Sequence, residues 1–126
     1  MIAALLPAHC TSTGKVLLAY AERDYVLEHL AAELPRYTPY TITSRDALLD
    51  ELAQVRLQGY ARAWGEHEDY VHALGVPIRG RAGEVIAAMS ISGLAVRIEG
   101  EIVAEMIQAL KQAAVEIAAG LGYVDR

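Results

Sequence analysis

The chain has 126 residues, a hydrophobic fraction of 54% and a formal net charge of −5 at pH 7, which suits one domain built around one core. Lysines and arginines form no run, so these residues by themselves do not form the basic stripe that nucleic-acid binding needs. The single cysteine excludes an internal disulfide and fits a reducing compartment.

The beginning of the chain, MIAALLPAHC, is apolar but carries no basic residues and has only a short apolar core before Pro7. A secretory signal needs a longer core. No uncharged run approaches the roughly 18 residues that cross a bilayer. We therefore expect a protein without membrane segments that works in the cytoplasm.

The first part of the chain predicts helices. Residues 12–20 read as a helix with Thr11 or Ser12 as its N-cap, and a second helix covers about 22–34 and ends at Pro35. After a turn-rich loop over 36–44, Thr43 and Asp46 form a capping box that opens a third helix, which Gly59 ends.

The second part predicts strands over 60–64, 69–78 and 84–93, joined by polar turns. In the last strand, Ser90 and Ser92 alternate with Met89 and Ile91, which places the serines on the opposite face. A long helix over 98–119 follows, with an apolar stripe at Ile102, Met106, Leu110, Ala113 and Ile117. This order predicts one α+β domain over 1–126, with a small antiparallel sheet whose edge needs a partner.

The stretch PAHCTSTGKV has two possible chemical roles, as a phosphate-binding loop or as the site of a nucleophilic cysteine. A phosphate loop fails, because His9 stands where the first glycine is needed and Val16 follows Lys15 in place of a hydroxyl residue. Cys10 as a nucleophile stays an alternative, since a histidine and a helix start can lower a thiol pKa. An inert buried cysteine is the plainer interpretation.

The stretch GEHEDYVH gathers carboxylates with His67 and His72. A spacing of five places these histidines neither on one helical face nor on one strand face, so we expect no metal site and no metal cofactor. Glu66, Glu68 and Asp69 are expected to form a solvated turn.

A binding site at the first helix start explains more residues. Ser12, Thr13 and Gly14 are small, and the free amides of a helix start bind anions. If Ser90 and Ser92 face this start, a small pocket results, with polar groups on one side and apolar walls elsewhere. Alternatively, the two serines face water.

These same residues carry a resemblance to a family. LPAHCTSTGKVLLAY, LAQVRLQGYA, VPIRGRAGEVIAAMSISG and the last helix resemble the effector-binding domain of IclR-type bacterial transcriptional regulators, over about Leu6 to Gly122. The resemblance implies a GAF-like α+β domain that follows a winged helix-turn-helix, forms dimers or tetramers, and binds small organic acids or aromatic degradation intermediates without a cofactor.

The resemblance also implies site residues: backbone amides at Ser12 and Thr13, hydroxyls of Ser90 and Ser92, and an apolar wall near Val71 and Ala73. Two positions depart from other members. Ala63 replaces an acidic residue and is followed by Trp64, which would add an aromatic wall, and Ala73 replaces a cysteine found in some members.

The winged helix-turn-helix, and the helix and strands that normally open the effector domain, are absent from this sequence. We therefore expect the C-terminal part of an effector domain, which is a non-enzymatic ligand sensor whose exposed sheet edge pairs with another copy. DNA would be contacted only through the absent part. The alternatives are a small enzyme that uses Cys10 and an oligomerisation module without a ligand.

Overall fold

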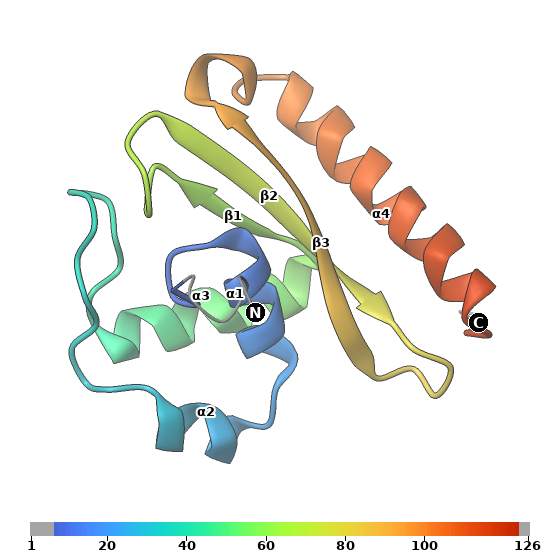
Figure 1. Cartoon of the computed structure of the whole chain (residues 1–126), viewed down its shortest axis with the longest axis horizontal. Helices are drawn as coiled ribbons and strands as arrows, with labels where there is room; N and C mark the ends of the chain where they lie inside the picture. Colours follow the sequence, from blue (N-terminus) through green and yellow to red (C-terminus); the bar gives the residue numbers. More distant parts are fainter. Residues whose placement is uncertain (1–6, 124–126) are drawn as a thin grey trace.

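The computed structural model describes residues 7–123 and arranges them as helices on both faces of a small sheet (Figure 1). The elements in chain order are α1 (Ser12–Tyr20), α2 (Arg23–His29), α3 (Arg45–Gln58), β1 (Ala61–Trp64), β2 (Val71–Arg79), β3 (Val85–Leu94), a 3-10 turn (Ala95–Arg97) and α4 (Ile102–Gly120). The predicted α+β class and the three predicted strands are confirmed.

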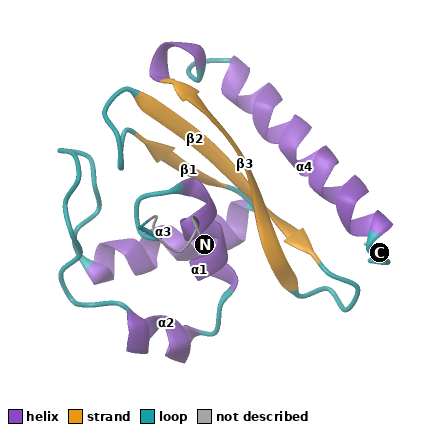
Figure 2. Ribbon diagram, viewed as in Figure 1, coloured by secondary structure: helices purple, strands orange, loops and turns teal. Residues whose placement is uncertain are grey.

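The sheet is an antiparallel meander in the order β1-β2-β3 (Figure 2). In its register Ala61 lies opposite Gly75, and Val76 lies opposite Met89. A bulge between Ile78 and Arg79 shifts the pairing where β2 enters the turn to β3. Within residues 7–123, β3 pairs with no strand other than β2, so one of its edges is open.

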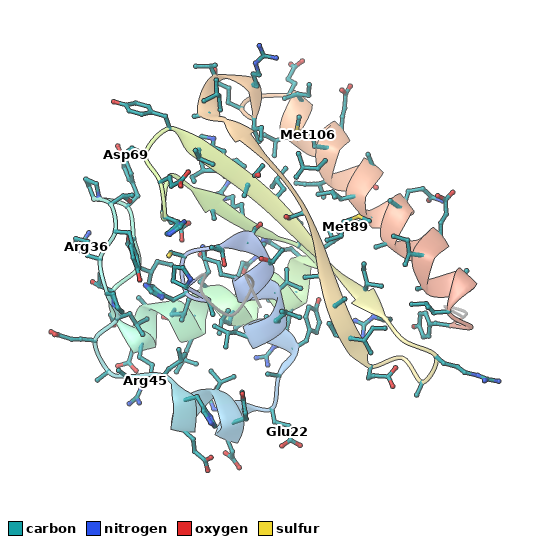
Figure 3. All side chains as sticks on the ribbon, in the orientation of Figure 1. Glu22, Arg36, Arg45, Asp69, Met89 and Met106 are labelled. Atoms are coloured by element: carbon teal, nitrogen blue, oxygen red, sulfur yellow. The ribbon has the colours of Figure 1, made fainter. Side chains whose placement is uncertain are left out.

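The two faces of the sheet are covered by different helices, with α1 and α3 on one side and α4 on the other (Figure 1). The α1 side holds one apolar cluster, which includes Val16, Leu48, Leu52, Val55 and Ala61. The α4 side holds a second cluster, which includes Leu74, Val76, Ile98, Ile107 and Leu110. Met89 of β3 and Met106 of α4 join this second cluster at its margin (Figure 3).

The alternation of side chains along β3 agrees with the sequence pattern. Met89 and Ile91 pack into the α4 cluster, whereas Ala88 packs against the α1 cluster. Ser90 and Ser92 share the parity of Ala88, so they face the α1 side of the sheet. The strand itself therefore sets which face carries the hydroxyls.

The helix ends follow local capping chemistry, but the cap of α3 and the end of α2 differ from the prediction. Thr11 is the N-cap of α1, as predicted, and its hydroxyl accepts from Gly14 N at 3.2 Å. Ser44 rather than Thr43 caps α3, because Ser44 has the extended backbone of a cap and accepts from Ala47 N at 3.3 Å. The α2 helix ends at His29, five residues before the predicted end.

The buried seam of α4 differs from the predicted stripe. Ile107, Leu110, Ala114 and Ala118 are buried, whereas Ile102 and Ile117 are 43% and 40% exposed. Apolar residues surround most of this helix, so periodicity does not select one face. The tertiary structure selects the buried face of α4, because that face packs against Leu74 and Val76 of β2.

Candidate functional site

The start of α1 is held by the loop that precedes it. Thr11 accepts from Gly14 N and donates to Pro7 O at 2.9 Å, which ties the loop to the first helical turn. An added Cβ at Gly14 would lie 2.5 Å from Ala8 Cα, so glycine is needed there for the chain's own close approach. The room expected beside Gly14 for a ligand is therefore occupied by residue 8.

The amides of Ser12 and Thr13 have no carbonyl one turn earlier within the helix, and the positive end of the helix dipole lies there. Ser12 is 3% exposed, and its backbone lies against the sheet at Gly75. A Cβ at Gly75 would stand 3.0 Å from Ser12 O. Glycine on β2 thus lets the helix start approach the strand backbone.

The predicted serines lie across the sheet from this contact. Gly75 pairs with Ser90, and Ala73 pairs with Ser92, so these residues form adjacent rows on the α1 face. Val71 has the same parity as Ala73 and pairs with Leu94. The structure thus brings Ser12, Val71, Ala73, Ser90 and Ser92 to one face of the sheet.

This face is open on its β3 side. Ser90 and Ser92 are both exposed, and the two cavities described for residues 7–123 lie elsewhere. The ligand contacts of the α1 face therefore stay a prediction. Ser90 and Ser92 are accessible from the side of the open β3 edge, whereas Ser12 is buried.

Trp64 does not join this group. It pairs with His72 and stacks on its imidazole, with ring centroids 4.4 Å apart, on the α4 face of the sheet. Its neighbour Ala63 pairs with Ala73 and is 4% exposed, so Ala63, like Ala61, lies on the α1 face. Period-two alternation separates these adjacent residues, and an aromatic wall from Trp64 does not form beside the serines.

Cys10 does not have the environment of a nucleophile. It is 1% exposed, and burial raises the pKa of its thiol to about 11, with the Glu66 carboxylate as a second cause. A thiol with such a pKa stays protonated at neutral pH. His9, which precedes it, has its Nε2 atom 2.8 Å from Pro35 O. Both observations argue against the alternative of a small cysteine enzyme.

Lys15 is a buried charged residue whose ion pairs were not predicted from the sequence. Its side chain is fully buried, and its ammonium lies 2.6 Å from Glu51 Oε2 and 2.6 Å from Glu66 Oε1. It also donates to Arg62 O at 2.9 Å, which ties α1 to β1. A lysine directly between Gly14 and Val16 in an apolar helix was the available signal.

Glu66 corrects the expectation of a solvated turn. It is 9% exposed, and two threonine hydroxyls of the 36–44 loop hold the turn: Thr38 donates to Gly65 O at 2.5 Å and Thr41 donates to Glu66 O at 2.6 Å. The contact of Oε1 with Lys15 is an ion pair without the alignment of a hydrogen bond. Burial raises the pKa of Glu66, and Lys15 opposes this rise.

Two further points concern metal ions and membranes. Within residues 7–123, no three histidine, cysteine, aspartate or glutamate side chains gather into a group that could hold a metal ion. Among the helices of this same part, none combines the length and apolarity needed to cross a membrane.

Comparison with known proteins places these features in a family. The family model described as "Bacterial transcriptional regulator IclR C-terminal" matches residues 1–119. The HTH-type transcriptional regulator KdgR of Escherichia coli is 43% identical over 120 residues, which are 94% of this chain and 46% of KdgR. The chain thus spans about half the length of these curated relatives.

Solved structures agree with the sequence match. The crystal structure of the C-terminal domain of E. coli KdgR is 42% identical, with a TM-score of 0.84, over 93% of this chain and 72% of that chain. The inducer-binding domain of PobR from Acinetobacter, solved as a double mutant in complex with 3-hydroxybenzoic acid, is 36% identical with a TM-score of 0.84. That match covers 90% of this chain and 66% of the PobR chain.

Proposed function

Because this chain belongs to the IclR family of bacterial transcriptional regulators, as part of their C-terminal domain, we propose that it binds a small organic or aromatic acid on the α1 face of its sheet. The amides of Ser12 and Thr13 would bind the carboxylate, and the hydroxyls of Ser90 and Ser92 would donate hydrogen bonds to it. Val71 and Ala73 supply the apolar side of the site.

One observation carries this proposal: the start of α1 lies against Gly75, and Gly75 lies directly opposite Ser90. A helix start and a strand hydroxyl thus meet across a residue that has no side chain. Lys15 beneath the helix already faces two carboxylates, so the anion would be bound by the amides and not by this ammonium.

The regulatory role of the chain is proposed from its relatives. Occupancy of the site would shift the conformational equilibrium of the domain, and a DNA-binding part of the whole protein would respond to this shift. The relatives are regulators, so we assign a non-enzymatic role in the cytoplasm. PobR, whose inducer-binding domain was solved with 3-hydroxybenzoic acid, suggests an aromatic acid as the first ligand to test.

Calorimetric titration with 3-hydroxybenzoate and a panel of small organic acids tests the site. An acid that binds should lose about tenfold or more in affinity when Ser90→Ala and Ser92→Ala are combined, because two hydrogen bonds to a charged group are lost. Ser44→Ala is the control, since it removes a hydroxyl at the start of α3 and should leave the affinity unchanged. Equal affinity in the double variant removes the serines from the site.

The open edge of β3 supports a second part of the proposal, which is self-association. Ile86 and Leu94 of this strand are 53% and 57% exposed, and an unpaired apolar edge favours pairing with another strand. Sedimentation at micromolar concentration should show a dimer or a larger species. A stable monomer at that concentration contradicts pairing between copies.

A further inference from the structure

A cavity of about 470 Å³ lies under the C-terminal half of α4, at the end of β2. It forms where β2 runs past the beginning of β1, since Ala61 pairs with Gly75 and β2 continues to Arg79. The last residue of α1, Tyr20, and the turn after α3 close its other sides. Its volume falls in the range of about 300–1,000 Å³ that small-molecule pockets have.

Pro77 explains why β1 does not extend into this space. The carbonyl of Val71 accepts from Gly65 N at 2.9 Å, so Val71 presents its backbone groups to the β1 side of β2. Backbone groups alternate with a period of two, which places those of Pro77 on the same side. Proline has no N–H to donate to a longer β1, and the chain instead enters the left-handed turn at Gly59 (φ 80°).

The floor of the cavity is apolar and made of small side chains. Val76, Ala114 and Ala118 are 1%, 7% and 4% exposed, and all of them line it. Alanine occupies positions on α4 where a leucine would fill the space against β2. An apolar group of a ligand would therefore displace water from a surface that has no polar side chain.

Two cations border this floor. The Arg79 guanidinium lies 5.3 Å from the centroid of the Tyr20 ring and donates to Gly83 O at 2.9 Å. The Lys111 ammonium donates to Gln58 O at 2.8 Å and lies 5.5 Å from the centroid of the Tyr60 ring. Each group keeps further N–H donors beyond these single hydrogen bonds.

Neither cation is neutralised by the residues of the described chain. The ion pairs found within residues 7–123 are both made by Lys15, which does not line the cavity. In a chain of net charge −5, two cations without carboxylate partners beside one apolar cavity form a local site for an anion.

We propose that the cavity between α4 and the end of β2 binds an organic carboxylate that has an apolar body. The carboxylate lies between Arg79 and Lys111, and the apolar body lies on Val76, Ala114 and Ala118. This site is separate from the one proposed on the α1 face, because none of the residues proposed there lines the cavity. The floor has no polar side chain that would suit a sugar or a nucleotide.

Titration followed by amide NMR shifts tests this proposal with three probes. 1-Naphthoate carries both features, 1-naphthamide carries only the apolar body, and acetate carries only the charge. We expect naphthoate to shift the amides of residues 114–119 saturably, naphthamide to bind about tenfold more weakly, and acetate to give no saturable shift at these amides. Equal affinity for naphthoate and naphthamide overturns the role of the cations.

Variants locate the site. Val115 lines the cavity and is 54% exposed, so Val115→Glu adds a carboxylate at the mouth without touching the core, and naphthoate affinity should fall about tenfold or more. Ala109→Glu adds the same charge to an exposed position of α4 that does not line the cavity, and it should leave the affinity unchanged. Equal losses in the two variants contradict the location.

Two further variants separate this site from the α1 face. Replacing both cations by Arg79→Gln and Lys111→Gln should weaken naphthoate and leave naphthamide binding as it was. The Ser90→Ala and Ser92→Ala variant should keep the naphthoate shifts at residues 114–119, even if it loses a ligand of the α1 face. Naphthoate shifts confined to residues 12–14 and 88–92 overturn the proposal without affecting the one for the α1 face.

Discussion

The two faces of the sheet are packed by different physical means. On the α1 face, a fully buried lysine joins carboxylates of α3 and of the turn after β1, and glycines let backbones approach closely. On the α4 face, the contacts are apolar, and small residues of α4 such as Ala114 and Ala118 line the cavity. An ion pair and close backbone contacts reinforce the apolar packing of α1, whereas α4 rests mainly on apolar contacts and leaves a cavity at one end.

This difference bears on where a ligand signal can arise. An ion pair in a buried place tolerates little displacement, because separating the charges leaves each of them desolvated. An apolar contact can slide at a small cost. If a ligand binds as proposed, the α1 face would provide a fixed frame for its polar groups, and the α4 face would provide adaptable volume.

The largest expected effect comes from breaking the ion pair on the α1 face. Lys15→Met keeps a similar volume but leaves the Glu66 carboxylate buried without a cation. We expect a loss of roughly 3–5 kcal/mol in the free energy of unfolding, measured by urea denaturation. Lys111→Met is the control, because Lys111 makes one hydrogen bond and, within residues 7–123, no ion pair, and it should cost about 1 kcal/mol.

A double variant sharpens this test. Adding Glu66→Gln to Lys15→Met removes the orphaned charge, so the combined loss should be smaller than the sum of the single losses. If Lys15→Met costs no more than Lys111→Met, the difference between the two faces is not electrostatic.

The next effect concerns the seam of α4. Leu110 is 4% exposed, and Leu110→Ala should lower the free energy of unfolding by about 2–5 kcal/mol through lost contacts and a new void. Ile117→Ala should change it by only about 0.5 kcal/mol, because Ile117 is 40% exposed. Comparable losses at both positions would mean that α4 packs through the stripe predicted from periodicity.

The smallest effect is a pH dependence on the α1 face. Because burial raises the pKa of Glu66 above its ordinary value of 4.5, the folded protein holds a proton that the unfolded chain has released. Stability from this carboxyl therefore falls as pH rises from 4.5 through the raised pKa, and it is constant above that. Glu66→Gln should gain in stability relative to the wild type over this window in denaturation curves. A constant difference between them contradicts the raised pKa.

Strands and turns were predictable because their signals are local. Alternation along β3 assigned Ser90 and Met89 to opposite faces, and Gly59 marked the end of α3. The cap at Thr11 was also predicted from short-range chemistry, since its hydroxyl reaches an amide three residues away. The residues themselves suggested Ser12, Ser90 and Ser92, and the family resemblance added Val71 and Ala73. The structure brings these five to one face of the sheet.

Other features depend on partners that are distant in the sequence. The partner of Lys15 at Glu66 lies 51 positions away, in a turn that looks solvated when it is read alone. Trp64 was placed in the site because it follows Ala63, but adjacent strand residues face opposite ways and the wall does not form. For α4, the choice of seam was made by β2, since the helix is apolar on most sides.

The sequence by itself determined the α+β class, the three-strand meander and the placement of the serines opposite Met89 and Ile91, since these follow from residue preferences and a period of two. Only the tertiary structure decided where Lys15 finds its counter-charges, which side of α4 is buried, and that a cavity opens beyond β1. Those outcomes depend on the volumes and charges of elements that meet only when the chain is folded.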